Sequence, residues 1–308
     1  MATANENAHI IIKGSDNWQP VLLNIMHKAG IRADVMEHFT RRGQSTLWLF
    51  SKKSRPYKII YHLGGSSALF CILARLRGKQ IVSHWIGTDV MRYHGKMNPF
   101  KHLGVWVHQH LVGIQLADSE IIQDELRGIG IESNLLRLLP EAIIGHITPL
   151  PEQPVILSYW DDQRFDFYGG DIVMLLAKAF PEVKFVILRA TGKGLENVPP
   201  NVQFSGLIDN VSEIYRSSTC LIRIPKHDGL SAMVLEAMAN GRYVIYNKKC
   251  PFTSFANDFD SARKSLENIL REQQPNIEGA EYVKKNFNID SEANRLRKLM
   301  NETFSFIQ

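Results

Sequence analysis

Short apolar runs alternate with segments of helical apolar spacing along most of the chain. In the first half, apolar runs predict strands at 10–13, 46–50, 58–62, 80–84, 113–117 and 134–139. Between several of them, apolar residues recur every three or four positions, which predicts helices at 21–27, 66–77, 99–110 and 119–127. Strands that alternate with helices are typical of a parallel sheet that is covered on both faces.

A second region of the same kind follows a proline-rich stretch. Residues 140–154 contain four prolines, which stiffen the chain and remove backbone donors, so this stretch is predicted to be a linker. The alternation then resumes, with predicted strands at 155–158, 183–188, 202–205, 220–224 and 243–246 and predicted helices at 171–180, 211–216 and 231–240. After residue 251 the pattern predicts no strand, only helices at 261–271 and 291–304, with Asp260 and Asp290 as their N-caps.

These two regions predict an α/β fold that contains two doubly wound units in tandem. The chain of 308 residues is also about twice the usual size of one domain. We expect an N-terminal domain at 1–148, a C-terminal domain at 149–289, and a closing helix at 290–308 that packs back towards the N-terminal domain.

The composition is that of a globular chain. Apolar residues make up 44% and charged residues 22%, which argues against a disordered or fibrous protein. The longest apolar run, 68–74, is far shorter than the roughly 20 residues that span a bilayer, and the N-terminus lacks a signal-peptide pattern. Three cysteines without C-x-x-C spacing favour buried thiols in a reducing compartment. The sequence therefore predicts a cytoplasmic protein.

Positive charge is concentrated in the first half of the chain. Residues 1–148 carry 17 basic and 11 acidic side chains, whereas residues 149–308 carry 19 and 20. A basic half suits an anionic lipid surface or a phosphorylated substrate, and the chain has no nucleic-acid recognition motif. Peripheral membrane contact through this half is one interpretation, and a solvated loop surface is the other. The residues concerned are Arg41, Arg42, Trp48, Lys52, Lys53 and Arg55.

Residues 201–247 carry the strongest indication of chemistry. A predicted strand ends at Pro225, and the letters HDGLS lead into the predicted helix at 231–240. Free N–H groups at a helix N-terminus bind phosphate through hydrogen bonds and through the helix dipole. In this sequence those groups belong to Gly229, Leu230, Ser231 and Ala232.

Two acids accompany this helix start. Asp228 and Glu236 are eight residues apart, and Glu236 falls within the apolar sequence of the predicted helix. A carboxylate in apolar surroundings needs a partner, and a ribose diol offers it two hydroxyl donors. The alternative is that Glu236 pairs with a neighbouring arginine or caps a loop.

At this point the sequence resembles a known family. The series V-x-F-x-G, E-x-Y, I-P-x-x-D-G-L-S and L-E-A-M-A-N-G-x-Y-V-I is similar to the donor-binding domain of retaining GT-B glycosyltransferases of family four, also called group 1. The match is specific within 201–247 and looser from 150 to 250. It implies two Rossmann-like domains that face each other across a cleft, with the nucleotide-sugar held mainly by the second and the acceptor mainly by the first.

The resemblance implies roles for residues of the second half. Glu236 matches the acid that holds the nucleotide ribose. Asp228 matches the acid that faces the transferred sugar, where the family usually has Glu. The stretch 229–232 matches the loop whose amides meet the diphosphate and the sugar, and UDP-sugars are the commonest donors in the family. The turn beside the base is matched by Gly206, Leu207 and Ile208.

One part of the family pattern is absent. The family usually carries an arginine and a lysine in the loop after the first strand of this domain, where they neutralise the leaving diphosphate. Arg164 matches the arginine, but Tyr-Gly-Gly at 168–170 occupies the region of the lysine. Lys226 and Arg223 are the nearest cations that could substitute, and some cation is needed because the transition state builds charge on the leaving group.

The resemblance extends to part of the first half. SHWIGTDV at 83–90 resembles the family's H-G-T-D loop, in which His84 would lie near the donor sugar. A buried structural histidine at a strand end is the alternative. The acceptor side is assigned to Asp89 of the same loop and to Gly14, Ser15 and Trp18, which resemble the family's first glycine-containing loop.

No metal and no cofactor are predicted. Asp258 and Asp260 match the D-x-D signature of another transferase fold, but they precede a predicted helix and are better interpreted as acids that cap it. The histidines at 102, 108 and 110 lack the i, i+4 spacing that places two zinc ligands on one helix face.

The sequence therefore predicts a metal-independent glycosyltransferase that moves a sugar with retention of anomeric configuration. The acceptor would be a glycan or a lipid-linked sugar. Arg164 and the helix N-terminus would take up the leaving-group charge, while His84 and Asp228 orient the sugar. The alternatives are a non-catalytic binding or scaffold subunit with this fold, and a nucleotide-sugar epimerase.

Overall fold

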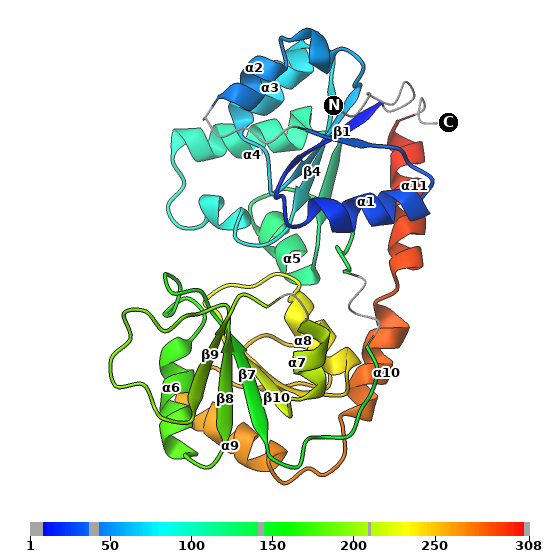
Figure 1. Ribbon diagram of the computed structural model, residues 1–308. Coiled ribbons are helices and arrows are strands. Elements are labelled where there is room, and N and C mark those ends of the chain that lie inside the picture. Colours follow the sequence, from blue (N-terminus) through cyan, green and yellow to red (C-terminus); the bar gives the residue numbers. More distant parts are fainter. Residues whose placement is uncertain (1–8, 37–42, 141–144, 209–210, 305–308) are drawn as a thin grey trace. The chain divides into compact units, whose positions relative to one another are not determined.

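The chain forms two compact units. Unit 1 contains Met1–Leu139 together with Asn288–Gln308, and unit 2 contains Pro140–Phe287. In each unit a parallel sheet lies among helices, as the alternating pattern predicts. Figure 1 presents the computed structural model, which describes residues 9–36, 43–140, 145–208 and 211–304.

Unit 1 is built on a six-stranded sheet. The strands lie in the order β2-β1-β3-β4-β5-β6, and neighbours pair in parallel. The strand order reverses between β1 and β3, and α/β folds place ligands at the carboxyl ends of the strands at such a reversal. The strands are β1 (Ile10–Gly14), β2 (Asp34–Val35), β3 (Ile59–Leu63), β4 (Gln80–Trp85), β5 (Ile114–Ala117) and β6 (Asn134–Leu135).

One predicted strand of unit 1 is wrong. Residues 46–50 lie in a short helix and the turn after it, because Trp48 and Leu49 are buried while Leu47 and Phe50 are exposed, which is not the alternation of a strand. The buried Trp48 is therefore not part of a lipid-facing surface, and Arg41 and Arg42 lie outside the described residues. The helices of unit 1 are α1 (Gln19–Lys28), α2 (Gln44–Trp48), α3 (Ala68–Leu76), α4 (Pro99–Leu111), α5 (Glu120–Gly128) and α11 (Ile289–Thr303), with single 3-10 turns at Lys52–Ser54 and Val90–Tyr93.

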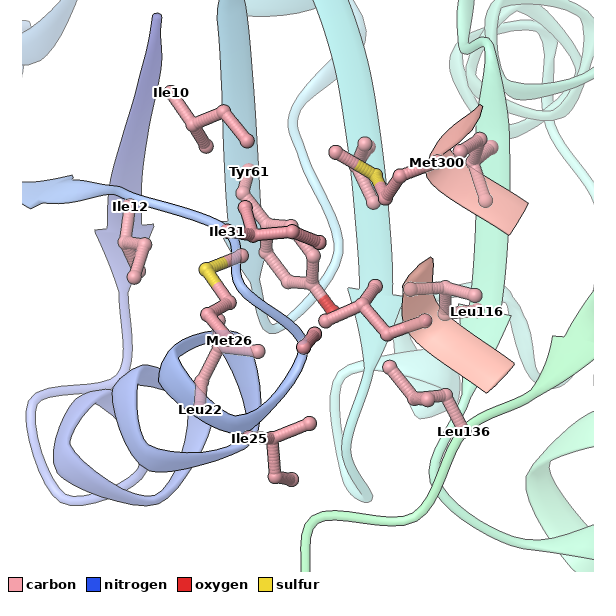
Figure 2. Packing of buried hydrophobic residues seen from close by; sticks show 14 of the residues in the cluster. Ile10, Ile12, Leu22, Ile25, Met26, Ile31, Tyr61, Leu116, Leu136 and Met300 are labelled. Carbon is pink, nitrogen blue, oxygen red and sulfur yellow. The ribbon is translucent and has the colours of Figure 1, made fainter. Parts of the chain in front are cut away.

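The C-terminal helix α11 completes the core of unit 1. It lies beside α1, and both helices contribute to the apolar cluster on one face of the sheet (Figure 2). Lys28 Nζ forms an ion pair with Asp290 Oδ1 over 2.8 Å, and Arg297 Nε donates to the Ala29 carbonyl over 2.7 Å. The N-cap of α11 is Asn288 and not the predicted Asp290. The cluster in Figure 2 includes Ile10, Ile12, Leu22, Ile25, Met26, Ile31, Tyr61, Leu116, Leu136 and Met300.

Unit 2 repeats this plan with another strand order. Its sheet runs β12-β11-β10-β7-β8-β9, all in parallel, so the order reverses between β7 and β10. The strands are β7 (Val155–Tyr159), β8 (Lys184–Leu188), β9 (Val202–Gly206), β10 (Cys220–Arg223), β11 (Tyr243–Tyr246) and β12 (Ser254–Phe255). The helices are α6 (Gly170–Ala179), α7 (Val211–Arg216), α8 (Ala232–Ala239), α9 (Phe259–Ile269) and α10 (Ile277–Asn286).

Three predictions for the end of unit 2 are wrong. A strand, β12, does occur after residue 251, and it is only two residues long, too short to leave a hydrophobic pattern. The helix α10 was not expected. The N-cap of α9 is Asp258, not Asp260, and Asp258 Oδ1 accepts from the Ser261 backbone N–H over 2.8 Å.

Of the three cysteines, Cys71 and Cys220 are buried and Cys250 is partly exposed.

Candidate functional site

The candidate site in unit 2 lies where its strand order reverses. Tyr159 ends β7, Arg223 ends β10 and Tyr246 ends β11, so these three side chains lie at the carboxyl edge of neighbouring strands. The segment from 224 to 231 connects β10 to α8 at the same edge and contains Asp228. The residues that the sequence singles out are therefore positioned where doubly wound sheets bind ligands.

Asp228 is held by a two-point ion pair with Arg223. The guanidinium donates from Nε to Oδ2 over 2.8 Å and from Nη2 to Oδ1 over 3.1 Å, and the Tyr246 hydroxyl donates to Oδ2 over 3.1 Å. The two charged side chains are only 11% and 13% exposed. Because each carboxylate oxygen has two lone pairs, Oδ1 can accept one further hydrogen bond, such as one from a sugar hydroxyl. The sugar-facing role of Asp228 stays a prediction.

The Arg223 guanidinium also lies against two tyrosine rings. Its Cζ is 5.8 Å from the ring centroid of Tyr159 and 5.2 Å from that of Tyr168. Burial would lower the pKa of Arg223, but the Asp228 carboxylate and the nearby tyrosines outweigh burial and raise it above its ordinary value. Arg223 is therefore charged, and its charge is already matched by Asp228. It does not replace the missing lysine as a free cation.

The helix α8 begins as predicted, and its N-terminus has no side-chain cap. Ser231 is the N-cap residue, but its side chain accepts no hydrogen bond from the first turn. Its Oγ is buried and has no hydrogen-bond partner among the described residues. The first N–H groups of α8 thus lack the acceptor that an N-cap serine normally provides, and an anionic ligand oxygen would supply one.

Glu236 lies on α8 and forms one side-chain hydrogen bond. The Tyr215 hydroxyl of α7 donates to Oε2 over 3.0 Å, while Oε1 has no partner within the described parts of the chain. Burial raises the pKa of Glu236, and the Tyr215 hydrogen bond partly opposes this rise. No arginine of the described residues pairs with Glu236. A half-buried carboxylate with one unused oxygen fits the ribose interpretation better than the arginine alternative.

Arg164 lies in the loop that follows β7. Its side chain is 55% exposed, its Nε is 3.9 Å from Asp161 Oδ2, and its Cζ is 5.8 Å from the ring centroid of Phe167. These contacts are loose, so the guanidinium is accessible to an anionic ligand. Its role towards a diphosphate stays a prediction.

The same loop explains why no lysine stands beside Arg164. Gly169 has a φ of +72°, and a Cβ at this position would lie 2.7 Å from the Ile224 carbonyl oxygen. The Lys226 backbone N–H donates to the Phe167 carbonyl over 2.8 Å, so this loop and the segment after β10 are in direct contact. A side chain at 169 has no room. The Lys226 side chain is exposed at this contact and remains a candidate cation.

The structure adds Arg189, which the sequence patterns do not indicate. Arg189 follows β8 with a φ of 71°, which is uncommon for a residue other than glycine. Its Nη1 donates to the Tyr159 hydroxyl over 3.2 Å. Asp162 joins the loops after β7 and β8, because its Oδ1 accepts from the Thr191 backbone N–H over 2.9 Å. Only the pairing of β7 with β8 brings Arg189 to the site, so no local motif could have found it.

The predicted turn beside the base follows the edge strand β9. Gly206 has a φ of +64°, and open space surrounds the position of a Cβ. Leu207 is 84% exposed and Ile208 is half-buried. An exposed apolar side chain next to an open turn could contact a planar base, and this role also stays a prediction.

His84, which the resemblance places near the donor sugar, is fully buried inside unit 1. Its Nδ1 lies 2.8 Å from the Tyr61 hydroxyl and its Nε2 lies 2.9 Å from the Leu136 carbonyl oxygen. A carbonyl can only accept, so Nε2 carries the proton and Nδ1 accepts from Tyr61. Burial lowers the pKa of His84 to about 3. Both ring nitrogens are satisfied, which favours the structural alternative that the sequence left open.

The residues assigned to the acceptor side lie at the carboxyl edge of the unit 1 sheet. Gly14 has a φ of +113°, and a Cβ there would lie 2.0 Å from the Leu63 carbonyl oxygen, so only glycine fits. The Trp18 backbone N–H donates to the Ser15 carbonyl over 3.1 Å at the start of α1. Burial raises the pKa of Asp89 to about 6, although Arg92 and the backbone amides oppose the rise. Their contact with an acceptor is not tested by these features.

No group of three or more His, Cys, Asp or Glu side chains among the described residues could hold a metal ion. None of the helices in this part of the chain is both long enough and apolar enough to span a bilayer.

Comparison with solved structures identifies the fold. No family model matches the sequence, and no curated protein matches it. HepE of Anabaena in complex with UDP-glucose is 11% identical, with a TM-score of 0.74 over 96% of this chain and 98% of that one. The sucrose-phosphate synthase of Thermosynechococcus elongatus is 14% identical, with a TM-score of 0.75 over 96% and 98%. The chain has the GT-B fold.

A third GT-B structure is similar to the same extent. The lipopolysaccharide outer core galactosyltransferase WaaB, in its apo form, is 14% identical to this chain, with a TM-score of 0.69 over 95% of this chain and 99% of that one. Likeness at this level of identity concerns the fold alone, and the resemblance to family four stays a hypothesis.

Proposed function

We propose that this chain is a glycosyltransferase that moves a sugar from a nucleotide-sugar to an acceptor. The observation that carries the proposal is Glu236, whose Oε2 is bonded to Tyr215 and whose Oε1 has no partner among the described residues. Glu236 lies on the helix whose N-terminus is uncapped at Ser231. A ribose linked to a diphosphate would satisfy both groups at once. HepE, a neighbour in fold, was determined with UDP-glucose, which supports this class of donor.

In this proposal the donor is a UDP-sugar held by unit 2. Glu236 accepts hydrogen bonds from the ribose hydroxyls, and the turn at 206–208 lies beside the base. The backbone N–H groups of 229–232 bind the diphosphate through the N-terminus of α8. Asp228, fixed by Arg223, accepts a hydroxyl of the sugar through its remaining lone pair.

The transfer breaks the bond between the anomeric carbon and the diphosphate oxygen and forms a bond from that carbon to an acceptor hydroxyl oxygen, whose proton passes to the released diphosphate. Charge then develops on the leaving diphosphate, and groups that are already oriented towards it lower the barrier. We assign this task to the N-terminus of α8, with Arg164 and Lys226 as the side-chain cations. In this proposal the chain's own positive groups balance the negative charge of the leaving diphosphate, so the mechanism needs no metal. His84 takes no part, because it is buried and both of its ring nitrogens are bonded.

Calorimetry with nucleoside diphosphates tests the donor site. The wild-type chain should bind UDP more tightly than GDP or ADP. Glu236→Gln should weaken UDP binding by tenfold or more, because the amide has no negative charge and only one acceptor oxygen, which Tyr215 and the ribose would have to share. The matched control is Glu182→Gln, which changes an exposed carboxyl of unit 2 and should leave the affinity unchanged. Absence of UDP binding at millimolar concentration would overturn the proposal.

Product analysis separates transfer from the two alternatives. A transferase releases UDP and couples the sugar to an added acceptor, and NMR of the product reports whether the anomeric configuration is retained. A scaffold subunit would bind UDP and show no turnover with any acceptor. An epimerase would convert the donor sugar into its isomer with no acceptor present.

We further propose that unit 1 contacts an anionic membrane surface on the cytoplasmic side, where a lipid-linked acceptor would lie. The neighbouring helices α3 and α4 expose large apolar side chains. Residues 43–112 carry ten Lys or Arg side chains and a single acid, Asp89. Apolar side chains among cations suit an anionic lipid surface, which offers both a hydrocarbon layer and negative charge. The exposed apolar residues are Leu69, Leu76, Phe100, Leu103 and Trp106.

Vesicle sedimentation tests this surface. The chain should bind vesicles with 30 mol% phosphatidylglycerol and not vesicles of phosphatidylcholine alone. Replacing both Phe100 and Trp106 by Ser should reduce binding at least fivefold. Leu175→Ser, which changes a 47% exposed leucine of unit 2, should have no effect. Equal binding by the wild type and the two variants, or binding independent of lipid charge, would overturn the proposed membrane contact.

A further inference from the structure

A second polar cluster lies at the reversal of strand order in unit 1. Lys13 of β1 and His62 of β3 are register partners at the carboxyl ends of these two strands. The Lys13 Nζ is 2.7 Å from His62 Nε2 and 4.6 Å from the ring centroid of Phe70 in the first turn of α3. Doubly wound sheets bind their ligands at this place, and no role assigned so far uses these side chains.

Lys13 is a partly buried cation without an anionic partner. Among the described residues, no carboxylate forms an ion pair with it. Burial, together with the smaller effect of the Arg92 charge and against an opposing effect of Cys71, lowers the pKa of Lys13 to about 8. A cation withdrawn from water without a counter-charge is costly, so a bound anion would stabilise it.

His62 offers an unused donor beside Lys13. The ammonium of Lys13 can only donate, so His62 Nε2 accepts from it and the ring proton resides on Nδ1. This Nδ1 is buried and has no hydrogen-bond partner in the described parts of the chain. Burial and the charges of Lys13 and Arg92 lower the pKa of His62 well below its ordinary value, so the ring is neutral. The cluster therefore presents N–H donors and no free acceptor.

The loop between β3 and α3 adds to the positive character of this place. Gly64 has a φ of +94°, and open space surrounds the position where its Cβ would be, while its N–H already donates to the His84 carbonyl over 2.8 Å. Arg92 Nη2 donates to the Gly64 carbonyl over 3.2 Å, which brings a second cation to the loop. The loop leads into the N-terminus of α3, where the Ser67 hydroxyl already accepts from the Phe70 backbone N–H, so the helix contributes its dipole alone.

The remaining titratable groups around the cluster do not supply the missing negative charge. Burial raises the pKa of the Cys71 thiol to about 11 and lowers the pKa of His108 to about 4, so both are neutral at pH 7. Asp89 lies beside the same loop, since its Oδ2 would be 3.2 Å from a Cβ at Gly65. It interacts with Arg92, and it forms no ion pair with Lys13.

We propose that Lys13, His62 and Arg92 bind the phosphate group of a phosphorylated ligand beside the open space at Gly64. Two cations and a neutral N–H donor match the two negative charges and the several oxygens of a phosphomonoester better than they match the single charge of a carboxylate. The cluster is built from unit 1 alone, so it can be tested without the donor site. The next step rests on the proposed function. In a glycosyltransferase whose donor is held by unit 2, a phosphate group bound in unit 1 belongs to the acceptor, so the acceptor is phosphorylated.

Calorimetric titration with inorganic phosphate at pH 7 tests the cluster. Wild type and the control Arg32→Met, which changes an exposed arginine of unit 1, should bind phosphate equally. Lys13→Met should bind it at least tenfold more weakly, while its melting temperature without phosphate stays the same or rises, because a buried charge is removed. Unchanged phosphate affinity in Lys13→Met would overturn the proposal, as would equal binding of acetate and phosphate by the wild type.

Two additions keep the test decisive. Arg92→Met, at an exposed position, should weaken phosphate binding severalfold even if Lys13→Met does not fold. Affinity for phosphate should fall as the pH rises through 8, where Lys13 loses its proton, and a pH-independent affinity contradicts the assignment. Loss of glycerol 3-phosphate binding in Lys13→Met identifies a soluble ligand. Loss of binding to phosphatidic acid vesicles identifies a lipid phosphate. Loss of UDP binding would instead concern the donor site in unit 2.

Discussion

The ion pair between Arg223 and Asp228 permits a quantitative test of the site in unit 2. Both side chains are nearly buried, and Asp228 receives two hydrogen bonds from the guanidinium and one from Tyr246. Asp228→Asn keeps the shape and removes the negative charge. Arg223 then stays buried against tyrosine rings with no counter-charge.

The expected loss of stability is large. Breaking a buried pair costs about 3–5 kcal/mol, and we take the lower end, about 3 kcal/mol, because Asn still accepts one hydrogen bond and the pair is partly exposed. For a domain of this size, that corresponds to a fall in melting temperature on the order of 6–12 °C. Replacing the pair as Arg223→Met with Asp228→Asn removes the uncompensated charge and should recover most of this loss.

Differential scanning calorimetry of the full chain checks this reasoning through the melting temperature of the transition in which unit 2 unfolds. The matched control is Glu182→Gln, at an exposed position between α6 and β8, which should shift the melting temperature by no more than about 1 °C. A shift of Asp228→Asn within that range would refute the idea that the pair matters for stability. A double variant no more stable than Asp228→Asn would show that the loss comes from another cause.

Three other predictions concern particular contacts. Gly169→Ala should destabilise unit 2 by about 1–3 kcal/mol in urea unfolding, because its Cβ would meet the Ile224 carbonyl oxygen at a positive φ. An unchanged stability would contradict the statement that position 169 has no room for a side chain. Tyr215→Phe removes the hydrogen bond that lowers the pKa of Glu236, so the midpoint of UDP binding in a pH titration should move to higher pH. An unchanged midpoint would mean that Glu236 does not bind UDP as a carboxylate. Acid should unfold unit 1 before unit 2, because the buried histidines of unit 1 are neutral when folded and gain protons on unfolding. Their contribution to stability is complete above about pH 6.5 and is lost as the pH falls towards the folded-state pKa values, by up to about 1.4 kcal/mol per pH unit for each histidine. Equal losses of stability by the two units between pH 7 and pH 5, measured by calorimetry, would refute this prediction. These histidines are His62, His84 and His108.

The sequence by itself determined most of the secondary structure and the fold class. Strands such as β1 and β10 are short, largely buried apolar runs, and helices such as α8 begin after a Gly-Leu-Ser turn, so local pattern is sufficient for them. The spacing of Asp228 and Glu236 around the start of α8 is also local. Local pattern failed at 46–50, where a short apolar run fits a helix end as well as a strand.

Only the tertiary structure decided which side chains meet. Arg189 reaches Tyr159 because β8 pairs with β7, and Lys13 meets His62, 49 residues away, because β1 pairs with β3 in one particular register. The burial of His84 depends in the same way on packing against Leu136. Such contacts follow from strand order and register, which the periodicity of a single strand does not contain, so sequence motifs could locate the edges of the sheets but not the charge arrangements there.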